Sequence, residues 1–216
     1  MSKVKVAAFA VSLDGFGAGP NQSLEKPLGV RGTELDKWFV KTKVFQKTHG
    51  GGGVGVEGVD NTFAEKSFEN IGAWIMGRNM FGPIRGPWIN NDWRGWWGEN
   101  PPFHTPVFVL TNHKREPLEL EGGTTFYFIT DGIESALKKA KEAAQNKDIR
   151  LGGGVKTIRE YLTAGLIDEL HLVFSPVFLG SGENLFSGID MPKLGFSVTK
   201  KEETEDATHI IVSKKK

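Results

Sequence analysis

Strand-like and helix-like segments alternate along the chain to about residue 170, and only strand-like segments follow. The strand-like segments are short apolar runs bounded by glycine, proline or aspartate, at residues 4–13, 73–76, 106–110, 124–129 and 148–151. The helix-like segments cover residues 33–47, 62–70, 133–145 and 155–164. This alternation predicts right-handed βαβ units around a parallel sheet whose strands are buried on both faces.

The C-terminal part predicts strands that run against this sheet. Residues 168–179 alternate around Leu170, Leu172 and Phe174 and indicate a long strand. Two further segments, near 195–203 and 207–213, are expected to pair as an antiparallel hairpin. The predicted fold class is therefore α/β, with a mostly parallel mixed sheet flanked by helices and closed by the hairpin. No linker or repeat divides residues 1–216, so we expect one domain.

Three local signals refine the helix boundaries. Thr33 is a candidate cap for the segment at 33–47, and Asp131 with Glu134 resembles a capping box before the segment at 133–145. Gly165 suits the position that follows the C-terminus of the segment at 155–164.

Composition excludes several classes of protein. The net charge of +1 lacks the basic excess that nucleic acids or anionic membranes require of a partner. The 216 residues include no cysteine, which rules out disulfides and thiolate chemistry. No apolar run approaches the roughly 18 to 20 residues of a membrane span, and Asp14 interrupts the apolar N-terminus. We therefore expect a cytoplasmic protein.

Three loops with phosphate-binding character each follow a predicted strand. They are Gly77-Arg78, the segment Thr111-Asn112-His113-Lys114, and Gly152 to Gly154. Ligands of open α/β sheets bind beyond the carboxyl ends of the strands, where glycines let backbone N–H groups approach a diphosphate. Cationic and hydroxyl side chains add donors for phosphate. The three loops together indicate a dinucleotide site.

Several stretches resemble the dihydrofolate reductase-like family, in particular the reductase domain of the bifunctional riboflavin-synthesis deaminase–reductase. The matching stretches are VSLDGF (11–16), WIMGRNMF (74–81), VFVLTN (107–112), LGGGVKTIREYL (151–162) and AGLIDELHLVFSPVFLGSGENLF (164–186). The last stretch is the most specific to this branch, and the others support the resemblance by their order.

The resemblance implies a reductase that uses NADPH, a small-molecule partner and a dihydrofolate reductase-like three-layer fold. The residues expected to hold the cofactor are Asp14, Phe16, Gly17, Gly77, Arg78, Thr111, Asn112, His113, Gly152, Gly153, Gly154 and Val155. The helix at 34–45, with Trp38 and Phe39, is expected to line the substrate side. The cofactor supplies the hydride chemistry, and the protein supplies orientation and a dry pocket.

Two departures from the family leave the substrate open. Dihydrofolate reductases place a carboxylate on the first helix, and here Asp36 is the candidate proton donor, with Glu34 nearby. Gly152 stands where riboflavin-pathway reductases carry an acidic residue. The substrate is expected to be a pterin-, pyrimidine- or flavin-precursor-like heterocycle or a carbonyl compound. The alternative is a binding protein that keeps the fold without turnover.

The remaining signals carry weaker expectations. Gly53 to Gly58 matches G-x-G-x-x-G but lacks a preceding strand, so we interpret residues 50–58 as a mobile loop that orders on ligand binding. The five histidines show no metal-ligand spacing, and no metal is expected. The insertion at 82–105 contains four tryptophans, which would form a small core, stack on a ligand or contact a second subunit. A homodimer is expected from the resemblance and from this surplus of aromatic residues.

Overall fold

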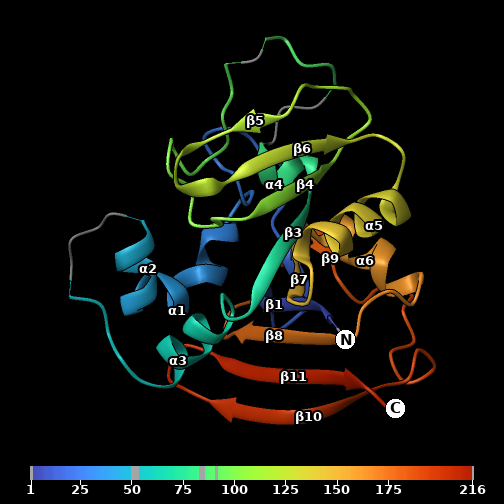
Figure 1. Cartoon of the computed structure of the whole chain (residues 1–216). Coiled ribbons are helices and arrows are strands. Elements are labelled where there is room, and N and C mark those ends of the chain that lie inside the picture. Colours follow the sequence, from blue (N-terminus) through green and yellow to red (C-terminus); the bar gives the residue numbers. More distant parts are fainter. Residues whose placement is uncertain (1, 50–53, 83–85, 91, 216) are drawn as a thin grey trace.

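A computed structural model describes residues 2–49, 54–82, 86–90 and 92–215. Within these residues, nine strands form one twisted sheet in the order β10-β11-β8-β1-β7-β3-β4-β6-β5 (Figure 1). Their bounds are β1 (Val4–Ser12), β3 (Ile71–Gly77), β4 (Pro106–Leu110), β5 (Leu118–Glu119), β6 (Thr125–Ile129), β7 (Asp148–Gly153), β8 (Glu169–Ser175), β10 (Phe196–Glu203) and β11 (Thr208–Lys214). A separate pair joins β2 (Phe16–Ala18) to β9 (Glu183–Asn184).

The pairing confirms the predicted mixed sheet. The run β8-β1-β7-β3-β4-β6 is parallel throughout, and β11 pairs antiparallel with both β8 and β10. The hairpin β10–β11 therefore extends a parallel sheet at one edge, as the C-terminal strand pattern predicts. The parallel strands point their carboxyl ends toward one edge of the sheet, where ligand sites of such folds lie.

Two groups of helices cover opposite faces of the sheet. Helices α5 (Ile133–Ala144) and α6 (Val155–Thr163) pack on one face, against a core that includes Val6, Ile75 and Leu151. On the other face lie η1 (Gly32–Asp36), α1 (Lys37–Val40), α2 (Lys43–Thr48) and α3 (Val59–Lys66), seen apart from α5 and α6 in Figure 1. The short elements α4 (Arg78–Phe81) and η2 (Glu121–Gly123) follow β3 and β5.

The predicted helix at 33–47 is broken into three pieces. Thr42 has an extended backbone (φ −70°, ψ 151°) and ends the helical run of α1. Its hydroxyl donates to the carbonyl of Phe39 at 2.6 Å and accepts from the N–H of Phe45 at 3.2 Å, so it caps α2. The prediction that Thr33 caps this helix is wrong, because η1 has no side-chain cap and begins after Arg31.

Several boundaries differ from the sequence expectations for local reasons. The predicted strand at 168–179 stops at Ser175, because Pro176 has no N–H to continue the ladder. The capping box before α5 is not formed, since Gly132 is the N-cap and Asp131 accepts from Ser135 instead. The role of Gly165 is confirmed. It has φ +71°, and the hydrogen bonds Gly165 N–H to Leu162 and Leu166 N–H to Tyr161 form a Schellman motif.

The tryptophan-rich insertion is packed onto the sheet. Trp88, Trp93 and Trp97 lie against a cluster of buried residues on β3, β4, β6 and α4 that includes Trp74, Phe81 and Phe126. The Trp93 indole donates to the carbonyl of Phe81 at 2.9 Å. Of the three interpretations of these tryptophans, a small core under a long loop explains most of the contacts that their side chains make. The sequence-based surplus of aromatics is thus largely used within the chain.

Candidate functional site

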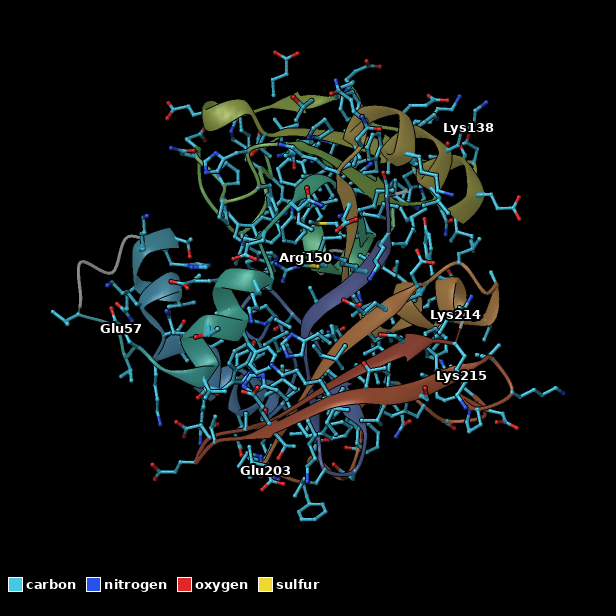
Figure 2. All side chains as sticks on the ribbon, turned by 60° about the horizontal axis from the view of Figure 1, so that its bottom comes forward. Glu57, Lys138, Arg150, Glu203, Lys214 and Lys215 are labelled. Carbon is cyan, nitrogen blue, oxygen red and sulfur yellow. The ribbon has the colours of Figure 1, made fainter. Side chains whose placement is uncertain are left out.

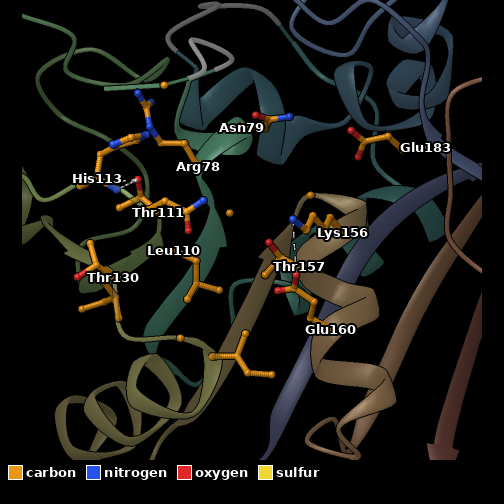
Figure 3. A pocket seen from close by; sticks show the side chains of 17 residues that line it. Arg78, Asn79, Leu110, Thr111, His113, Thr130, Lys156, Thr157, Glu160 and Glu183 are labelled. Carbon is orange, nitrogen blue, oxygen red and sulfur yellow. Dashed lines mark hydrogen bonds and ion pairs between the residues drawn. The ribbon is translucent and has the colours of Figure 1, made fainter. Parts of the chain in front are cut away.

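A pocket of about 320 Å³ lies at the carboxyl ends of β3, β4 and β6, beside the end of β7. Figure 3 shows its polar walls: Arg78, Thr111 and His113 on one side face Lys156, Thr157 and Glu160 on the other. The loops after four neighbouring strands therefore meet at one place, as the parallel sheet requires. The lining residues are Gly77, Arg78, Asn79, Gly86, Leu110, Thr111, Asn112, His113, Ile129, Thr130, Gly132, Ile133, Gly154, Lys156, Thr157, Glu160 and Glu183.

Two helices begin at this pocket. Gly132 and Ile133 start α5, and Gly154, Lys156 and Thr157 surround the start of α6. Neither N-terminus has a side-chain cap among the described residues, so the first N–H groups of each helix are left for another acceptor. The two helix N-termini and the ammonium of Lys156 together favour an anionic ligand.

Arg78 supplies a second cationic group, and its hydrogen bonds are incomplete. Its guanidinium lies 3.2 Å over the ring of Trp88, and its hydrogen bond to the carbonyl of Gly82 is long, at 3.4 Å. Nε and Nη2 are buried without a partner among the described residues. Burial, together with nearby Arg115, lowers the pKa of Arg78 to about 10, so the group stays charged at neutral pH. Unsatisfied buried donors of this kind favour a ligand that accepts hydrogen bonds.

Two glycines set the width of the pocket. A Cβ on Gly77 would overlap the Thr157 hydroxyl, so only glycine lets the end of β3 approach the start of α6 so closely. Gly154 has open space where its Cβ would stand, which leaves its backbone accessible to a ligand. The peptide bond between Gly153 and Gly154 is cis.

Six of the predicted cofactor residues line this pocket: Gly77, Arg78, Thr111, Asn112, His113 and Gly154. Other polar or helix-start residues of the lining were not predicted from the sequence: Thr130, Ile133, Lys156, Thr157, Glu160 and Glu183. Position after a strand was the signal that could have identified Thr130, which directly follows β6. Position in the first helical turns was the signal for Ile133 and Lys156. Glu183 comes from the short strand β9, far along the chain, and carried no such signal.

Six other predicted cofactor residues lie outside the lining of the pocket. The carboxylate of Asp14 is engaged by the Ser12 hydroxyl at 2.6 Å and by the N–H groups of Leu179 and Gly180, and these bonds lower its pKa, Ser12 most. Asp14 therefore anchors the loop after β8 rather than presenting a free carboxylate. The remaining five, Phe16, Gly17, Gly152, Gly153 and Val155, lie on β2, at the end of β7 and at the start of α6.

The predicted substrate-side residues have different environments. Trp38 is 2% exposed and packs with Ala64, Val173 and Ala207, so its side chain belongs to the core rather than to an open surface. Phe39 is partly exposed and stacks edge-on with Phe45. Asp36 is partly buried, and burial raises the pKa of its carboxyl to about 6. None of these three lines the pocket at the loops.

The described residues of the G-x-G-x-x-G segment, 54–58, do not line the pocket. Residues 50–53 fall outside the described residues, so the predicted mobility of the 50–58 loop stays a prediction. Helix α3 does begin directly after Gly58, but Val56 makes only an isolated bridge to Thr42 within the described part of this segment. A dinucleotide fingerprint requires a strand before its first glycine, and the described element that precedes this segment is helix α2 instead.

A second, smaller hollow of about 240 Å³ adjoins the first through Arg78. Trp88, Ile89, Asn90 and Trp93 of the insertion form its other walls. Elsewhere, no described helix has the length and apolar character needed to cross a bilayer.

The fold and the chain were compared with known proteins. Two solved structures share the fold: a protein from Shewanella sp. PV-4 provisionally assigned to riboflavin biosynthesis (TM-score 0.61, 24% identity, 100% of both chains), and a diaminohydroxyphosphoribosylaminopyrimidine deaminase/5-amino-6-(5-phosphoribosylamino)uracil reductase from Thermotoga maritima (TM-score 0.53, 18% identity). The latter match covers 98% of this chain and 55% of that one. Both establish the dihydrofolate reductase-like architecture.

A curated relative is the uncharacterized protein YyaP of Bacillus subtilis (strain 168). It is 42% identical over 92 residues, which are 41% of this chain and 48% of the relative's length. The family model described as the RibD C-terminal domain matches residues 4–212. That match spans nearly the whole chain, so the protein belongs to the RibD C-terminal domain family.

Proposed function

We propose that the protein is an NADPH-dependent reductase of a small heterocyclic or carbonyl substrate, related to reductases of the riboflavin pathway. The observation that carries the proposal is the pocket at the strand ends, where two uncapped helix N-termini and the unsatisfied guanidinium of Arg78 converge. A dinucleotide diphosphate matches this donor set in charge and in hydrogen-bonding capacity. When bound, NADPH supplies the hydride.

The residues present fit the cofactor on both walls of the pocket. Gly154 and Thr157 would hold the diphosphate at the start of α6, opposite Thr111 and His113 at the end of β4. Arg78 would meet a phosphate with its free nitrogens, because burial without a partner costs those donors free energy that a ligand can restore. Lys156 is free to move toward such a ligand, since its contact with Glu160 is long, at 3.9 Å.

Asp36 is the proposed proton donor on the substrate side. A carboxyl whose pKa burial raises to about 6 is partly protonated near neutral pH, which suits a group that gives up a proton during turnover. Exchange for the isosteric amide, Asp36→Asn, should lower turnover by about 10²- to 10⁴-fold and remove the ionisation near pH 6 from the rate profile. Binding of NADPH should stay within twofold. An unchanged pH profile in Asp36→Asn would assign the proton to water instead.

Calorimetry with NADPH, followed by NADPH oxidation against a panel of pterins, pyrimidines, flavin precursors and carbonyl compounds, tests the proposal. We expect binding of NADPH and oxidation with at least one class. The alternative is a binding protein of the same fold without turnover, favoured because neither Glu34 nor Asp36 falls cleanly in register with the helix carboxylate of dihydrofolate reductases. Binding without oxidation across the whole panel would support that alternative, and absence of binding would refute both.

A homodimer remains part of the proposal. Its support is now the resemblance together with exposed apolar side chains such as Phe178, which is 63% exposed, since most insertion tryptophans pack internally. Light scattering should give twice the chain mass of 23.8 kDa at micromolar concentration. A mass of one chain across that range would exclude the dimer.

A further inference from the structure

The peptide between Ala7 and Ala8 leaves the regular hydrogen-bond ladder of β1. The register of β1 against β8 shifts between Val6 and Phe9, and Ala8 has φ +54° in the left-handed region. At such a bulge the backbone C=O and N–H lose their ladder partners and need others. A non-glycine residue with this conformation also needs surrounding contacts that hold it there.

One side chain from each neighbouring strand holds this peptide. Arg150 on β7 donates from Nη2 to the carbonyl of Ala7 at 3.0 Å. His171 on β8 accepts the N–H of Ala8 at Nδ1, at 3.2 Å. We call Arg150 and His171, together with the peptide between them, the clamp. Both ends of one peptide unit are thus fixed by side chains rather than by backbone.

The arginine of the clamp is itself firmly placed. Nη1 of Arg150 donates to the carbonyl of Ser67 at 2.7 Å and to its hydroxyl at 3.0 Å. The guanidinium lies 4.3 Å over the ring of Trp74 and 4.9 Å over that of Phe68. Figure 2 shows Arg150 in the middle of the molecule, whereas the other labelled side chains lie around its periphery.

The histidine of the clamp is fixed by a directed chain of hydrogen bonds. A backbone N–H can only donate, so Nδ1 of His171 accepts and its Nε2 carries the proton. That Nε2–H donates to Nδ1 of His209 at 3.0 Å, and Nε2–H of His209 donates to Asp60 at 2.7 Å. The Thr204 hydroxyl also donates to Asp60, at 3.0 Å. The carboxylate therefore selects the tautomer of both rings.

The bulge decides which way the rest of β1 faces. Val4 and Val6 point into the core under α5 and α6, and after the bulge Phe9 and Val11 point to that same side. Side chains alternate with a period of two, so an extra residue reverses which positions face the core. Without the bulge, Phe9 would point to the opposite face of the sheet.

Phe9 connects the bulge to the predicted cofactor loops. A Cβ on Gly17 would stand 2.7 Å from the Phe9 ring, and one on Gly153 would stand 3.1 Å from it. The ring therefore lies against both the loop after β1 and the glycine loop after β7, next to Gly154 of the pocket. Displacement of Phe9 would move both loops together.

We propose that His171 is a positioning residue of the cofactor site: it holds the β1 bulge and thereby keeps the Phe9 ring between Gly17 and Gly153. Asp60 and His209 act through His171 by fixing its tautomer. The inference rests on the proposed NADPH site, and it concerns the end of that site beside the loop after β1. Arg78 and the start of α5, on other parts of the pocket wall, are not part of this inference.

Three substitutions separate the clamp from general packing. His171→Leu removes the acceptor for Ala8, and His171→Asn keeps an acceptor where Nδ1 stands. His171→Gln keeps a polar group at the Nε2 position only, and it serves if the leucine variant does not fold. Two ligands report on the two ends of the site: NADPH, and 2′,5′-ADP, which lacks the nicotinamide half.

We expect His171→Leu and His171→Gln to weaken NADPH binding by about tenfold and to leave 2′,5′-ADP within twofold of wild type. His171→Asn should restore NADPH binding to within about threefold. Equal loss of both ligands would mean a general structural role, and unchanged NADPH binding would mean that the clamp does not reach the site; either result overturns the proposal. Failure of the wild type to bind either ligand would instead refute the proposed function and, with it, this role.

A spectroscopic measurement tests the clamp independently of any ligand. The ¹⁵N shifts of the imidazoles in the free wild-type protein at neutral pH should show His171 and His209 as neutral rings protonated at Nε2. The Ala8 amide should exchange with solvent at least tenfold faster in His171→Leu than in His171→Asn. A wild-type His171 protonated at Nδ1, or equal exchange in the two variants, would overturn the proposal.

Discussion

Two buried arginines of this protein are used in opposite ways. Arg150 donates three hydrogen bonds to Ser67 and Ala7 and leaves only Nε without a partner among the described residues. Arg78 has one long bond to Gly82 and leaves both Nε and Nη2 unsatisfied. Each guanidinium lies over an indole ring, that of Trp74 for Arg150 and that of Trp88 for Arg78.

The difference separates a structural arginine from a candidate ligand-binding one. Burial lowers the pKa of both groups, and the surroundings must repay that cost. At Arg150 the carbonyls of Ser67 and Ala7 accept hydrogen bonds that offset the cost of burial, and Arg150 therefore holds β1 in place. At Arg78 two buried donors lack acceptors, and an anionic ligand would supply them. Charge and burial alone do not distinguish the two roles, whereas the count of satisfied donors does.

Acidification should give the largest effect, and it acts on the clamp formed by Arg150 and His171. The ordinary pKa of histidine is about 6.5, and burial, with His209, Arg150 and Lys200, lowers that of His171 to about 3. Between these values the unfolded chain binds a proton that the folded protein does not. Stability should therefore fall as pH falls below about 6.5, by up to about 1.4 kcal/mol per pH unit from this residue.

Denaturant unfolding of wild type and His171→Asn between pH 6.5 and 4.5 measures this contribution. Asp36, whose raised pKa acts with the opposite sign, contributes equally to both proteins and cancels in the difference. The wild type should show the steeper loss of stability with falling pH. Parallel pH dependences would show that His171 does not resist protonation.

Removal of Arg78 should give the second-largest effect. Arg78→Ala deletes a charge-assisted contact of about 1.5–3 kcal/mol, which corresponds to roughly 10- to 100-fold weaker NADPH binding. The matched control is Lys138→Ala, an exposed cation on α5 that Figure 2 places at the surface. Calorimetry should show the loss in Arg78→Ala alone. Equal affinities in the two variants would remove Arg78 from the site.

The narrow approach between β3 and α6 gives the next prediction. Gly77→Ala would place a methyl group against the Thr157 hydroxyl, and overpacking of this kind costs about 1–3 kcal/mol. The cost should shrink in a Thr157→Ala background, where the obstructing oxygen is absent. Unfolding of the four proteins of this double-mutant cycle measures the coupling. Additive effects would show that the two positions do not touch.

The change of cofactor preference with salt gives the smallest and most graded effect. We expect NADPH to bind about 10- to 1,000-fold better than NADH, because the 2′-phosphate needs charged donors and the two loops offer Arg78 and the 111–114 segment. The preference should decrease as salt rises from 0.05 to 0.5 M, since ions screen the attraction between the cationic donors and the 2′-phosphate. If Arg78 meets the diphosphate instead, Arg78→Ala will weaken both cofactors alike. Equal wild-type affinities would overturn the assignment.

The sequence predicted elements best where the signal was local. The apolar runs at 106–110 and 148–151 and the periodic segment at 133–145 match β4, β7 and α5 within two residues at each end. The segment at 33–47 failed because its apolar spacing continues through Thr42, where the hydroxyl satisfies backbone groups and stops the helix. Strands β2 and β9 have two or three residues each, too few to show any periodicity.

By itself, the sequence determined the mixed α/β sheet, the loops that follow its strands and the family, because periodicity, glycine positions and short motifs are properties of neighbouring residues. Only the tertiary structure decided the rest. It turned Asp14 into an anchor for Gly180, buried Trp38, and brought Glu183 to a pocket formed by the ends of β3 and β4. It also set His171 against the N–H of Ala8, 163 positions earlier in the chain. Such contacts depend on which strands and loops lie side by side in the folded chain, and no local sequence pattern encodes that.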